Sequence, residues 1–395
     1  MAKLTDETRA SLRRRSRLVN LGRDAEFSQG FINVPPFRGS TVLYPDVATL
    51  KGRAQRFTYG TRGTPSTEVL SSAWSDLTAA AGTVLVPSGL AAIVVALMTA
   101  LSADDHLLMT DSVYSPARAF ANKTLRRMGI ETTYYDPTIG AGIAALIRPN
   151  TRVVFTESPG SETLEVQDIP AIAEAAHGAG ACVIMDNTWA TPLFFQPHAH
   201  GVDMAIEAGT KYLSGHADLL LGLVSANAEW FERLHACVHL MAIPAGPEDV
   251  FLALRGLRTM ELRLREAERQ GLALAQWLAA RPEVLHVIHP ALPDHPGHKL
   301  WKRDFSGSSG LFSIVLKPAS EAAVAAFLDG LELFGLGYSW AGYESLIVPV
   351  DCTPRRTATR FAPGGPMVRF SVGLEDIEDL KADLDRGFKR LRTTV

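Results

Sequence analysis

Lys211 and Asp186 are the two residues of this sequence with the clearest potential for chemistry. Asp186 ends the apolar run of residues 181–185, and Lys211 directly follows the short run of residues 205–210. A carboxylate at the end of a buried strand costs free energy unless it meets a cation or hydrogen-bond donors. A desolvated lysine has a lowered pKa and can form a Schiff base. Two interpretations stay open: covalent chemistry at Lys211, or an ion pair with Asp186 that does no chemistry.

Three further segments place candidate ligand-binding residues directly after apolar runs. Residues 88–90 contain Ser and Gly and begin an Ala-rich, helix-like stretch. Small residues at a helix start leave backbone N–H groups open to a phosphate, although Ser and Gly also serve as ordinary helix caps. Tyr114 follows another apolar run and is either a cover for a flat ligand or a packed aromatic residue. Residues 157–160 follow a third run and are compatible with a simple turn.

The histidine spacings do not predict a metal site. His198 and His200, and likewise His295 and His298, stand close in sequence, but no carboxylate or cysteine completes either ligand set, so turn or surface histidines are expected. The sequence also has no glycine-rich dinucleotide fingerprint after a strand, no phosphate-binding GxxxxGK[ST] loop and no HExxH motif. A nicotinamide-dependent dehydrogenase is therefore disfavoured.

These candidate residues require a framework of alternating strands and helices. Between about residues 56 and 255, short apolar runs alternate with helix-like stretches, and four runs read as strands buried on both faces: residues 83–86, 106–110, 152–156 and 181–186. The alternation predicts a mostly parallel sheet with helices on both faces. Ligands of such sheets bind beyond the carboxyl ends of the strands, where the candidate residues stand.

The C-terminal part is expected to be smaller and α+β. An apolar stripe from Met260 to Leu278 predicts a long helix, and residues 310–316 and 367–372 read as strands. A final helix from about Leu374 to Leu391 has acids at its start and bases at its end, as the helix dipole favours.

The chain of 395 residues is too long for one core, so several domains are expected. We predict an irregular N-terminal arm at residues 1–58, an α/β domain at residues 59–256 and an α+β domain at residues 257–395. A net charge of -3 gives no reason to expect nucleic acid as a partner. The longest apolar stretch, residues 90–101, is too short to span a bilayer, so no membrane association is expected.

The cysteines and the first residues indicate a cytoplasmic location. Cys182, Cys237 and Cys352 are far apart in sequence, which fits a reducing compartment. The Arg-rich start lacks the apolar core of a signal peptide, and the early acids Asp6 and Glu7 argue against a transit peptide.

With these residues assembled, the chain resembles the Cys/Met-metabolism family of pyridoxal-phosphate enzymes. The resemblance extends from about Tyr59 to the C-terminus. It rests on several blocks in the family's order, which are Tyr59-Gly60-Thr61-Arg62-Gly63-Thr64-Pro65, Pro87-Ser88-Gly89, Asp186-Asn187-Thr188-Trp189, Thr210-Lys211-Tyr212-Leu213-Ser214-Gly215-His216, Arg255-Gly256-Leu257-Arg258-Thr259, Tyr338-Ser339-Trp340-Ala341-Gly342-Tyr343-Glu344-Ser345 and Arg369-Phe370-Ser371-Val372-Gly373-Leu374-Glu375-Asp376. It implies fold type I of the pyridoxal-phosphate-dependent transferases.

The resemblance also implies a site for pyridoxal 5'-phosphate. Lys211 would hold the cofactor aldehyde covalently, Asp186 would keep the pyridine nitrogen protonated, and Tyr114 would stack on the ring. The phosphate would be held by residues from two subunits of a dimer or tetramer: Ser88, Gly89, Leu90 and Thr210 from one, and Tyr59 with Arg62 from its neighbour. Lys211, Tyr114 and Tyr59 are the implied catalytic residues.

The sequence departs from the family pattern at two positions. The family usually has an arginine two residues after the tyrosine of the arm, and Thr61 stands there, with Arg62 next to it. Ala208 occupies the position at which many relatives have a phosphate-binding serine. Whether Arg62 takes the place of the arginine absent at Thr61 stays open, and Ala208 implies one phosphate contact fewer.

For the substrate, the resemblance implies a carboxylate clamp. Arg369 would bind the carboxylate with two parallel hydrogen bonds, and Ser339 would add a contact. The alternation agrees, since Arg369 shares its strand face with Met367 and Ser371; the alternative is an exposed charge on a half-buried strand. Tyr338 and Trp340 complete the implied substrate site.

The implied reaction is β-elimination at a sulfur-bearing amino acid. Lys211 would act as the base that removes the Cα proton. Tyr338-Ser339-Trp340 and residues 301–310 resemble the β-eliminating form, which implies cleavage of L-cystathionine to homocysteine, pyruvate and ammonia in methionine biosynthesis. Cysteine or cystine could be side substrates. Two alternatives stay open: a γ-lyase or γ-synthase of the same family, and a pyridoxal-phosphate-binding regulator without turnover.

Overall fold

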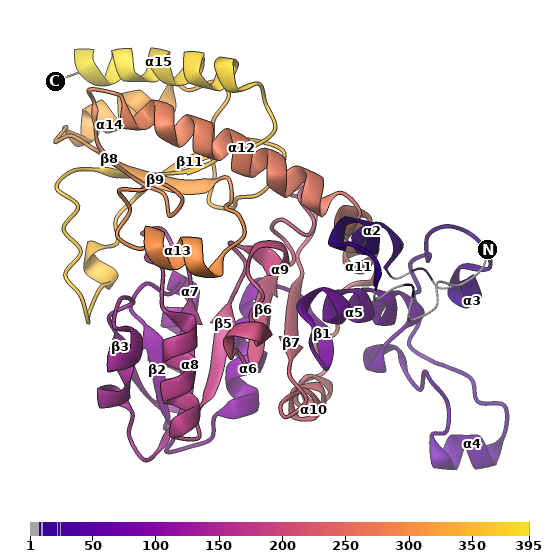
Figure 1. Cartoon of the computed structure of the whole chain (residues 1–395). Coiled ribbons are helices and arrows are strands. Elements are labelled where there is room, and N and C mark those ends of the chain that lie inside the picture. Colours follow the sequence, from indigo (N-terminus) through magenta and orange to yellow (C-terminus); the bar gives the residue numbers. More distant parts are fainter. Residues whose placement is uncertain (1–7, 9–10, 22, 24, 395) are drawn as a thin grey trace.

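The computed structural model of the chain describes residues 8, 11–21, 23 and 25–394, and Asp6 and Glu7 lie outside them (Figure 1). A seven-stranded sheet has the order β1-β7-β6-β5-β4-β2-β3. Four of its pairings are parallel, and only β7 runs antiparallel to its two neighbours. The prediction of a mostly parallel sheet is confirmed. The strands are β1 (Gly82–Val86), β2 (His106–Thr110), β3 (Glu131–Tyr135), β4 (Thr151–Glu157), β5 (Cys182–Asp186), β6 (Met204–Ala208) and β7 (Gly222–Ala226).

Both faces of this sheet are buried, because successive residues of each strand point to opposite sides. In β2, Leu107 and Met109 pack in one apolar cluster and Leu108 packs in the other. Buried residues of α6 (Gly89–Ala100), α7 (Ser115–Phe120) and α10 (Phe231–Met241) belong to the first cluster. The second cluster holds α5 (Pro65–Thr78), α8 (Ile169–Gly178), α9 (Thr191–Phe194) and α11 (Pro247–Leu257). The short elements between them are η2 (Ala121–Leu125), η3 (Gly140–Leu146) and η4 (His198–His200).

A second sheet, with the order β10-β11-β12-β9-β8, lies beyond one end of the first (Figure 1). Only its β10–β11 pairing is parallel. Its strands are β8 (Val284–Ile288), β9 (Leu311–Leu316), β10 (Gly335–Leu336), β11 (Leu346–Val350) and β12 (Met367–Ser371). The helices beside it are α12 (Met260–Ala279), α13 (His298–Asp304), α14 (Glu321–Asp329) and α15 (Ile377–Thr393), with the short η5 (Thr353–Arg355) before β12. The α+β character predicted for this part is confirmed.

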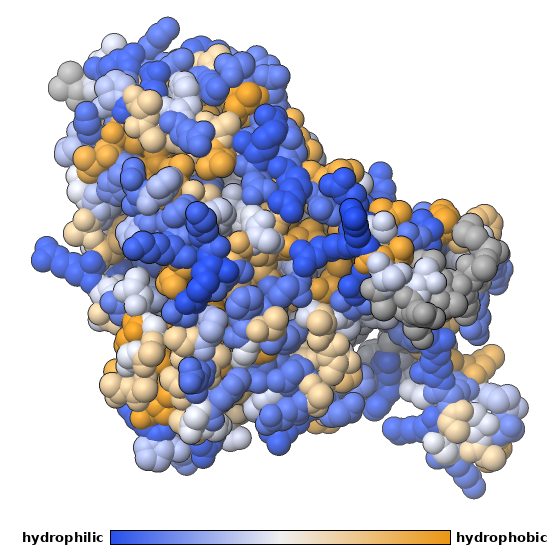
Figure 2. All heavy atoms as spheres, in the orientation of Figure 1, coloured by the Kyte–Doolittle hydropathy of each residue, from blue (hydrophilic) through white to orange (hydrophobic). Residues whose placement is uncertain are grey.

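The N-terminal arm is more regular than the sequence suggested. It contains α2 (Arg14–Asn20), α3 (Ala25–Ser28) and α4 (Val47–Gly52), and the short η1 (Gly60–Arg62) follows it. The expectation of an irregular arm is thus wrong in part, because α2 buries Leu18 and Leu21, and Arg17 binds Asp76 of α5 at 2.6 Å. By contrast, α4 buries no residue and projects from the body, as Figure 2 also shows.

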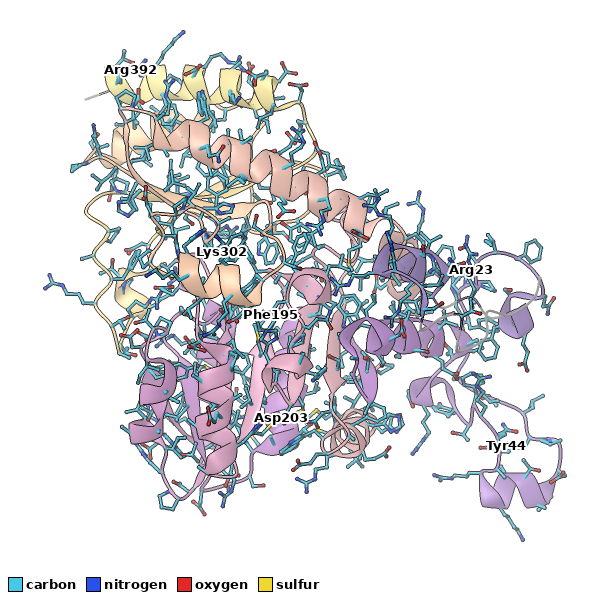
Figure 3. All side chains as sticks on the ribbon, in the orientation of Figure 1. Arg23, Tyr44, Phe195, Asp203, Lys302 and Arg392 are labelled. Carbon is cyan, nitrogen blue, oxygen red and sulfur yellow. The ribbon has the colours of Figure 1, made fainter. Side chains whose placement is uncertain are left out.

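The two ends of the large sheet differ in how their polar groups are used. Asp203, labelled in Figure 3, precedes β6 at the amino end, where it accepts hydrogen bonds from Val183 N at 2.7 Å and Asn227 Nδ2 at 2.8 Å and pairs with His177. These partners hold three segments together, which is a structural role. The carboxyl end of the same strands faces the second sheet and carries Asp186, the acid that the sequence analysis singled out.

Replacing Phe388 by Ala should destabilise the C-terminal part without touching the candidate site. Phe388 is fully buried and stacks on Phe327 with ring centroids 4.9 Å apart. Loss of such a ring costs about 3–5 kcal/mol of unfolding free energy. Urea unfolding should show a lowered midpoint for Phe388→Ala and an unchanged one for Leu285→Ala, whose side chain is exposed. Equal midpoints would contradict this packing.

Candidate active site

Three acidic side chains stand at or beside the carboxyl ends of adjacent strands. Glu157 of β4 is in register with Asp186 of β5, and Asp186 is in register with Ile206 of β6, next to Glu207. Lys211 lies in the turn after β6, where its N–H donates to Ala208 O at 2.9 Å. The parallel arrangement therefore gathers Asp186, Glu157 and Lys211 at one edge of the sheet, as predicted for the first and last of these residues.

The Lys211 amine is held between the two sheets. Its Nζ donates to Ser339 Oγ at 2.7 Å and lies 5.3 Å from the centroid of the Trp340 ring. Both partners come from the loop between β10 and β11. The pKa of Lys211 is lowered to about 8, mainly by burial and also by the charge of Arg369, while Asp186 opposes the shift. Near pH 8 about half of this amine is uncharged and can act as a nucleophile or base.

Asp186 does not form the ion pair that was one interpretation of the sequence. Its Oδ1 accepts hydrogen bonds from Thr188 N at 3.0 Å and Thr188 Oγ1 at 2.6 Å, and within the described residues no ion pair joins it to Lys211. Burial raises the pKa of Asp186, while Thr188 and Lys211 lower it. The two groups thus influence each other's pKa without an ion pair, so the interpretation as an ion pair is wrong.

Glu157 and Glu207 were missed as parts of the site. The sequence suggested a simple turn at Glu157, but its Oε2 accepts a hydrogen bond from Tyr114 N at 2.7 Å. Neither carboxyl oxygen of Glu207 has a hydrogen-bond partner in the described chain. Burial first, and then the charge of Asp186, raise the pKa of both groups well above the usual value. The raised pKa favours the protonated form of each acid. An acid that ends or interrupts a buried apolar run was the available signal.

Tyr114 stands beside this acid cluster. It precedes α7, its side chain is 44 % exposed, and its backbone is fixed by Glu157. Burial raises the pKa of its hydroxyl, with further increases from Asp186 and Glu157 and an opposing effect of Arg369. Tyr114 is therefore close enough to Asp186, Glu157 and Arg369 for their charges to shift its pKa. Its half-exposed ring is available to a flat ligand.

The start of α6 leaves two backbone N–H groups free of partners in the described chain, at the carboxyl end of the strands. Ser88 caps the helix by accepting a hydrogen bond from Ala91 N at 3.1 Å. The N–H groups of Gly89 and Leu90 donate to no group of the described chain and remain available. A Cβ at Gly89 would lie 2.7 Å from the Cβ of Ala208, so only glycine allows this close approach.

Thr210 and Ala208 lie at the same edge. The Thr210 hydroxyl exchanges hydrogen bonds with Leu221, donating to its carbonyl at 3.3 Å and accepting from its N–H at 3.1 Å. The small side chain of Ala208 is what the contact with Gly89 tolerates. A cradle of backbone N–H groups and one hydroxyl has the chemistry to bind a phosphate.

Arg369 of β12 enters the site from the second sheet. It is only 8 % exposed, so the alternative of an exposed charge is wrong. Its Nη2 donates to Tyr338 O at 2.6 Å and Ser339 O at 3.3 Å, which fixes the guanidinium. Burial lowers the pKa of Arg369, and nearby Glu162, Tyr114 and Tyr338 oppose this. The Tyr338 side chain itself is 85 % exposed.

Two predicted site residues are not brought to Lys211 within one chain. Tyr59 and Arg62 are exposed and line a groove of about 650 Å³ together with residues of the arm, α5, β1 and α10.

The four histidines considered as metal ligands bond locally instead; for example, His198 Nδ1 pairs with Val202 O at 2.8 Å and His298 Nδ1 with Pro290 O at 3.0 Å. In the described part of the chain, no three His, Cys, Asp or Glu side chains are placed to hold a metal ion.

Comparison with known proteins gives one family over almost the whole chain. The sequence model of the Cys/Met metabolism PLP-dependent enzymes matches residues 15–389. A Rhizobium johnstonii protein provisionally named a cystathionine β-lyase is 52% identical over 94% of this chain and 95% of its own length. The cystathionine β-lyase of Escherichia coli is 41% identical over 95% of this chain and 98% of its own. The crystal structure of a cystathionine γ-synthase from Xanthomonas oryzae has a TM-score of 0.89 at 31% identity, covering 97% of this chain and 100% of its own.

The reactivity of Lys211 should follow a pKa near 8 rather than the ordinary 10.5. Competitive labelling of the apo-protein with trace acetic anhydride, read by mass spectrometry over a pH series, would give this value. Because Arg369 lowers the pKa, Arg369→Leu should raise it; because Asp186 raises it, Asp186→Asn should lower it. A labelling midpoint near 10.5 in all three proteins would contradict the burial of the amine.

Proposed function

Because this chain belongs to the Cys/Met-metabolism family of pyridoxal-phosphate-dependent enzymes, we propose that it is a carbon–sulfur lyase acting on L-cystathionine. With one water consumed, β-elimination yields homocysteine, pyruvate and ammonia. The observation that carries the proposal is the Lys211 amine, half neutral near pH 8, held by Ser339 between Asp186 and Arg369. Two relatives named as cystathionine β-lyases, alike over nearly the full chain, support the same reaction.

The residues at the strand ends fit pyridoxal phosphate in three respects. A reactive amine at Lys211 matches the cofactor aldehyde, and the Asp186 carboxylate matches the pyridine nitrogen. The free N–H groups of Gly89 and Leu90 match a phosphate. In this proposal Ser88 and Thr210 complete the phosphate cradle, and Tyr114 covers the ring. When bound, the cofactor supplies an electron sink for the electron pair left at Cα.

Arg369 orients the substrate in the proposed reaction. Its guanidinium is buried and fixed by the Tyr338 and Ser339 carbonyl groups, so it can bind the α-carboxylate at little further entropic cost. That clamp places Cα toward Lys211, because the two residues are close enough for Arg369 to lower the lysine pKa.

Lys211 moves the proton. In its neutral form the Nζ accepts the Cα proton, and the thiolate then leaves Cβ with its bonding electrons. Ser339 holds the Nζ at 2.7 Å and restricts the directions in which it can act. The Trp340 ring, whose centroid is 5.3 Å from the Nζ, lies beside the amine.

The two alternatives have less support. A γ-lyase or γ-synthase would use the same lysine, so the choice rests on the named relatives and on Trp340, whose ring packs edge-on against Tyr212 with centroids 5.7 Å apart. A regulator without turnover has less support because the matched family is one of enzymes and the similar proteins are named as lyases.

We further propose a homo-oligomer, at least a dimer and by the family resemblance a tetramer, working in the cytoplasm. Tyr59 and Arg62 line an open groove away from Lys211 and would complete the phosphate site of a neighbouring subunit. The three cysteines are free, which fits a reducing compartment. The same proposal includes the domain boundaries, with the arm ending at residue 58 and the α/β domain at residue 256.

Purified protein incubated with L-cystathionine should release pyruvate and homocysteine, identified by chromatography. Lys211→Ala should abolish release, because no other amine stands at the site, whereas Lys317→Ala, an exposed lysine, should match the native protein. Release of 2-oxobutyrate and cysteine would move the reaction to a γ-lyase, and release of neither keto acid would refute the proposed activity.

Mixing two inactive variants tests the shared site. Tyr59→Ala should lose cofactor affinity and activity if Tyr59 serves the neighbouring subunit. Hybrids of Tyr59→Ala with Lys211→Ala, formed by mild unfolding and refolding together, should regain part of the activity, because one site then contains both native residues. Absence of recovery in verified hybrids would place Tyr59 in its own subunit's site or outside any site.

A further inference from the structure

Asp111 carries an unusually dense set of hydrogen bonds outside the proposed catalytic residues. It directly follows β2, precedes Tyr114 by three positions and is 2 % exposed. Its two oxygens accept from the N–H groups of Thr357 at 3.0 Å, Ala358 at 3.0 Å and Thr359 at 2.9 Å, and also from both threonine hydroxyls. Arg118 Nη2 donates to Oδ1 at 2.5 Å. The lone pairs of the carboxylate are therefore fully used.

Three successive N–H groups around one carboxylate form an anion-binding nest. Hydrogen bonds to an ionised acceptor are stronger than neutral ones. Burial alone would raise the pKa of Asp111, but the bonds from Thr357, Thr359 and Arg118 outweigh it and hold the pKa below the usual value. The group is thus ionised at neutral pH, and the nest around it is intact there.

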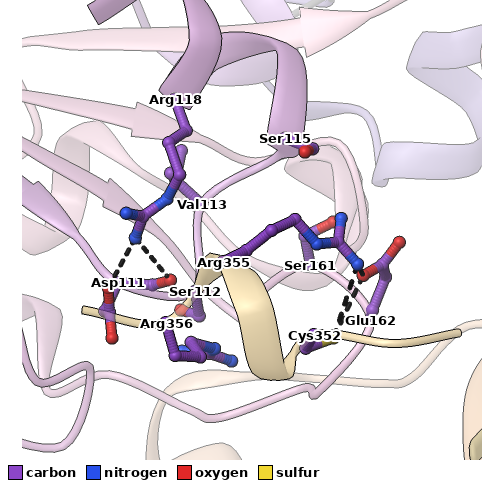
Figure 4. A pocket seen from close by; sticks show the side chains of 10 residues that line it. All are labelled: Asp111, Ser112, Val113, Ser115, Arg118, Ser161, Glu162, Cys352, Arg355 and Arg356. Carbon is purple, nitrogen blue, oxygen red and sulfur yellow. Dashed lines mark hydrogen bonds and ion pairs between the residues drawn. The ribbon is translucent and has the colours of Figure 1, made fainter. Parts of the chain in front are cut away.

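The bound segment belongs to the second sheet's side of the molecule. Residues 357–359 lie between η5 and β12, the strand that carries Arg369. Two ion pairs next to this segment help to hold it: Arg355 Nη2 donates to Glu162 Oε2 at 2.5 Å, and Arg356 Nη2 donates to Glu165 Oε1 at 2.9 Å. Figure 4 shows Arg118 directed at Asp111, and Arg355 of the C-terminal segment directed at Glu162.

Asp111 therefore links the two halves of the proposed site. On one side it is three residues from Tyr114, and Arg118 of the Tyr114 helix binds both its carboxylate and its backbone carbonyl, the latter at 3.1 Å. On the other side it holds the segment that leads into β12 and Arg369. Tyr114 and Arg369 are close enough to shift each other's pKa, so a small change in this link alters their separation.

We propose that Asp111 is a positioning residue that sets where Arg369 holds the substrate carboxylate relative to Lys211. The idea rests on the proposed function, since it assumes that Arg369 binds a carboxylate. Asp111→Asn keeps the size but replaces one acceptor oxygen by an NH₂ group that faces N–H donors. The segment of residues 357–359 would then loosen while Asp186, Lys211 and the helix start at Gly89 stay in place.

The first test measures docking of the segment without any activity. Trypsin can cut after Arg355, Arg356 and Arg360 once this segment detaches. Asp111→Asn should speed cleavage there, read by mass spectrometry. Asp168→Asn is a matched control, because Asp168 also accepts from a backbone N–H and pairs with an arginine, Arg303, but elsewhere. Equal cleavage in both variants and the native holoenzyme would overturn the docking role.

The second test is a double-mutant cycle on the affinity for L-alanine, an amino acid with a carboxylate and no leaving group. Asp111→Asn should weaken binding about tenfold in the native background and much less in Arg369→Lys, because coupled residues give non-additive effects. Cofactor affinity should stay native in both backgrounds. Thr359→Val, which removes one hydroxyl donor, should give a smaller effect of the same sign and serves if Asp111→Asn fails to fold.

The outcomes separate the two proposals. Equal weakening of L-alanine binding in both backgrounds, no weakening at all, or loss of cofactor affinity in Asp111→Asn would overturn the positioning role. Failure of the native enzyme to release pyruvate from L-cystathionine would refute the proposed reaction instead, while the cleavage and binding results would still decide what Asp111 does.

Discussion

The hydrogen bond between Lys211 and Ser339 joins the two sheets at the point where the chemistry is expected. The amine comes from the turn after β6 of the large sheet, and the hydroxyl from the loop between β10 and β11 of the small one. An amine in that position is removed from water by both parts of the chain, and burial is the first cause of its lowered pKa. The reactivity of the lysine is therefore a property of how the sheets are set against each other.

That setting depends on charge as much as on packing. Burial and the charge of Asp186 raise the pKa of Glu157 and Glu207 well above the usual value, which opposes the gathering of three negative charges next to one lysine. Arg369 supplies a positive charge from the opposite sheet and lowers the lysine pKa further. Burial and the charge of Arg369 together bring the pKa of Lys211 to about 8, close to physiological pH, which suits a base.

The need for a fixed arrangement of these charges also explains why the contacts between the large-sheet part and the small-sheet part of the chain are polar. The core of each half is apolar, as the stacked rings of Phe312 and Phe370, 5.3 Å apart, illustrate for the small sheet. Across the junction, Asp111 binds residues 357–359, and Glu162 binds Arg355. Directional hydrogen bonds fix distance and orientation more narrowly than apolar contact does, and an active site built from two walls needs both.

The sequence by itself determined the parallel sheet, the long helices and the identity of the principal residues. Apolar runs such as residues 106–110 are set by local periodicity, and Lys211, Asp186 and Gly89 stand in motifs whose spacing is visible in one dimension. Only the tertiary structure decided that Arg369 is buried, that Ser339 holds Lys211, that Glu157 fixes Tyr114, and that Tyr59 and Arg62 face a groove away from the lysine. The reason is physical: burial, pKa and hydrogen-bond partners depend on groups that are far apart in the chain, as Asp111 and Thr357 are. Periodicity carries no information about which distant segments meet.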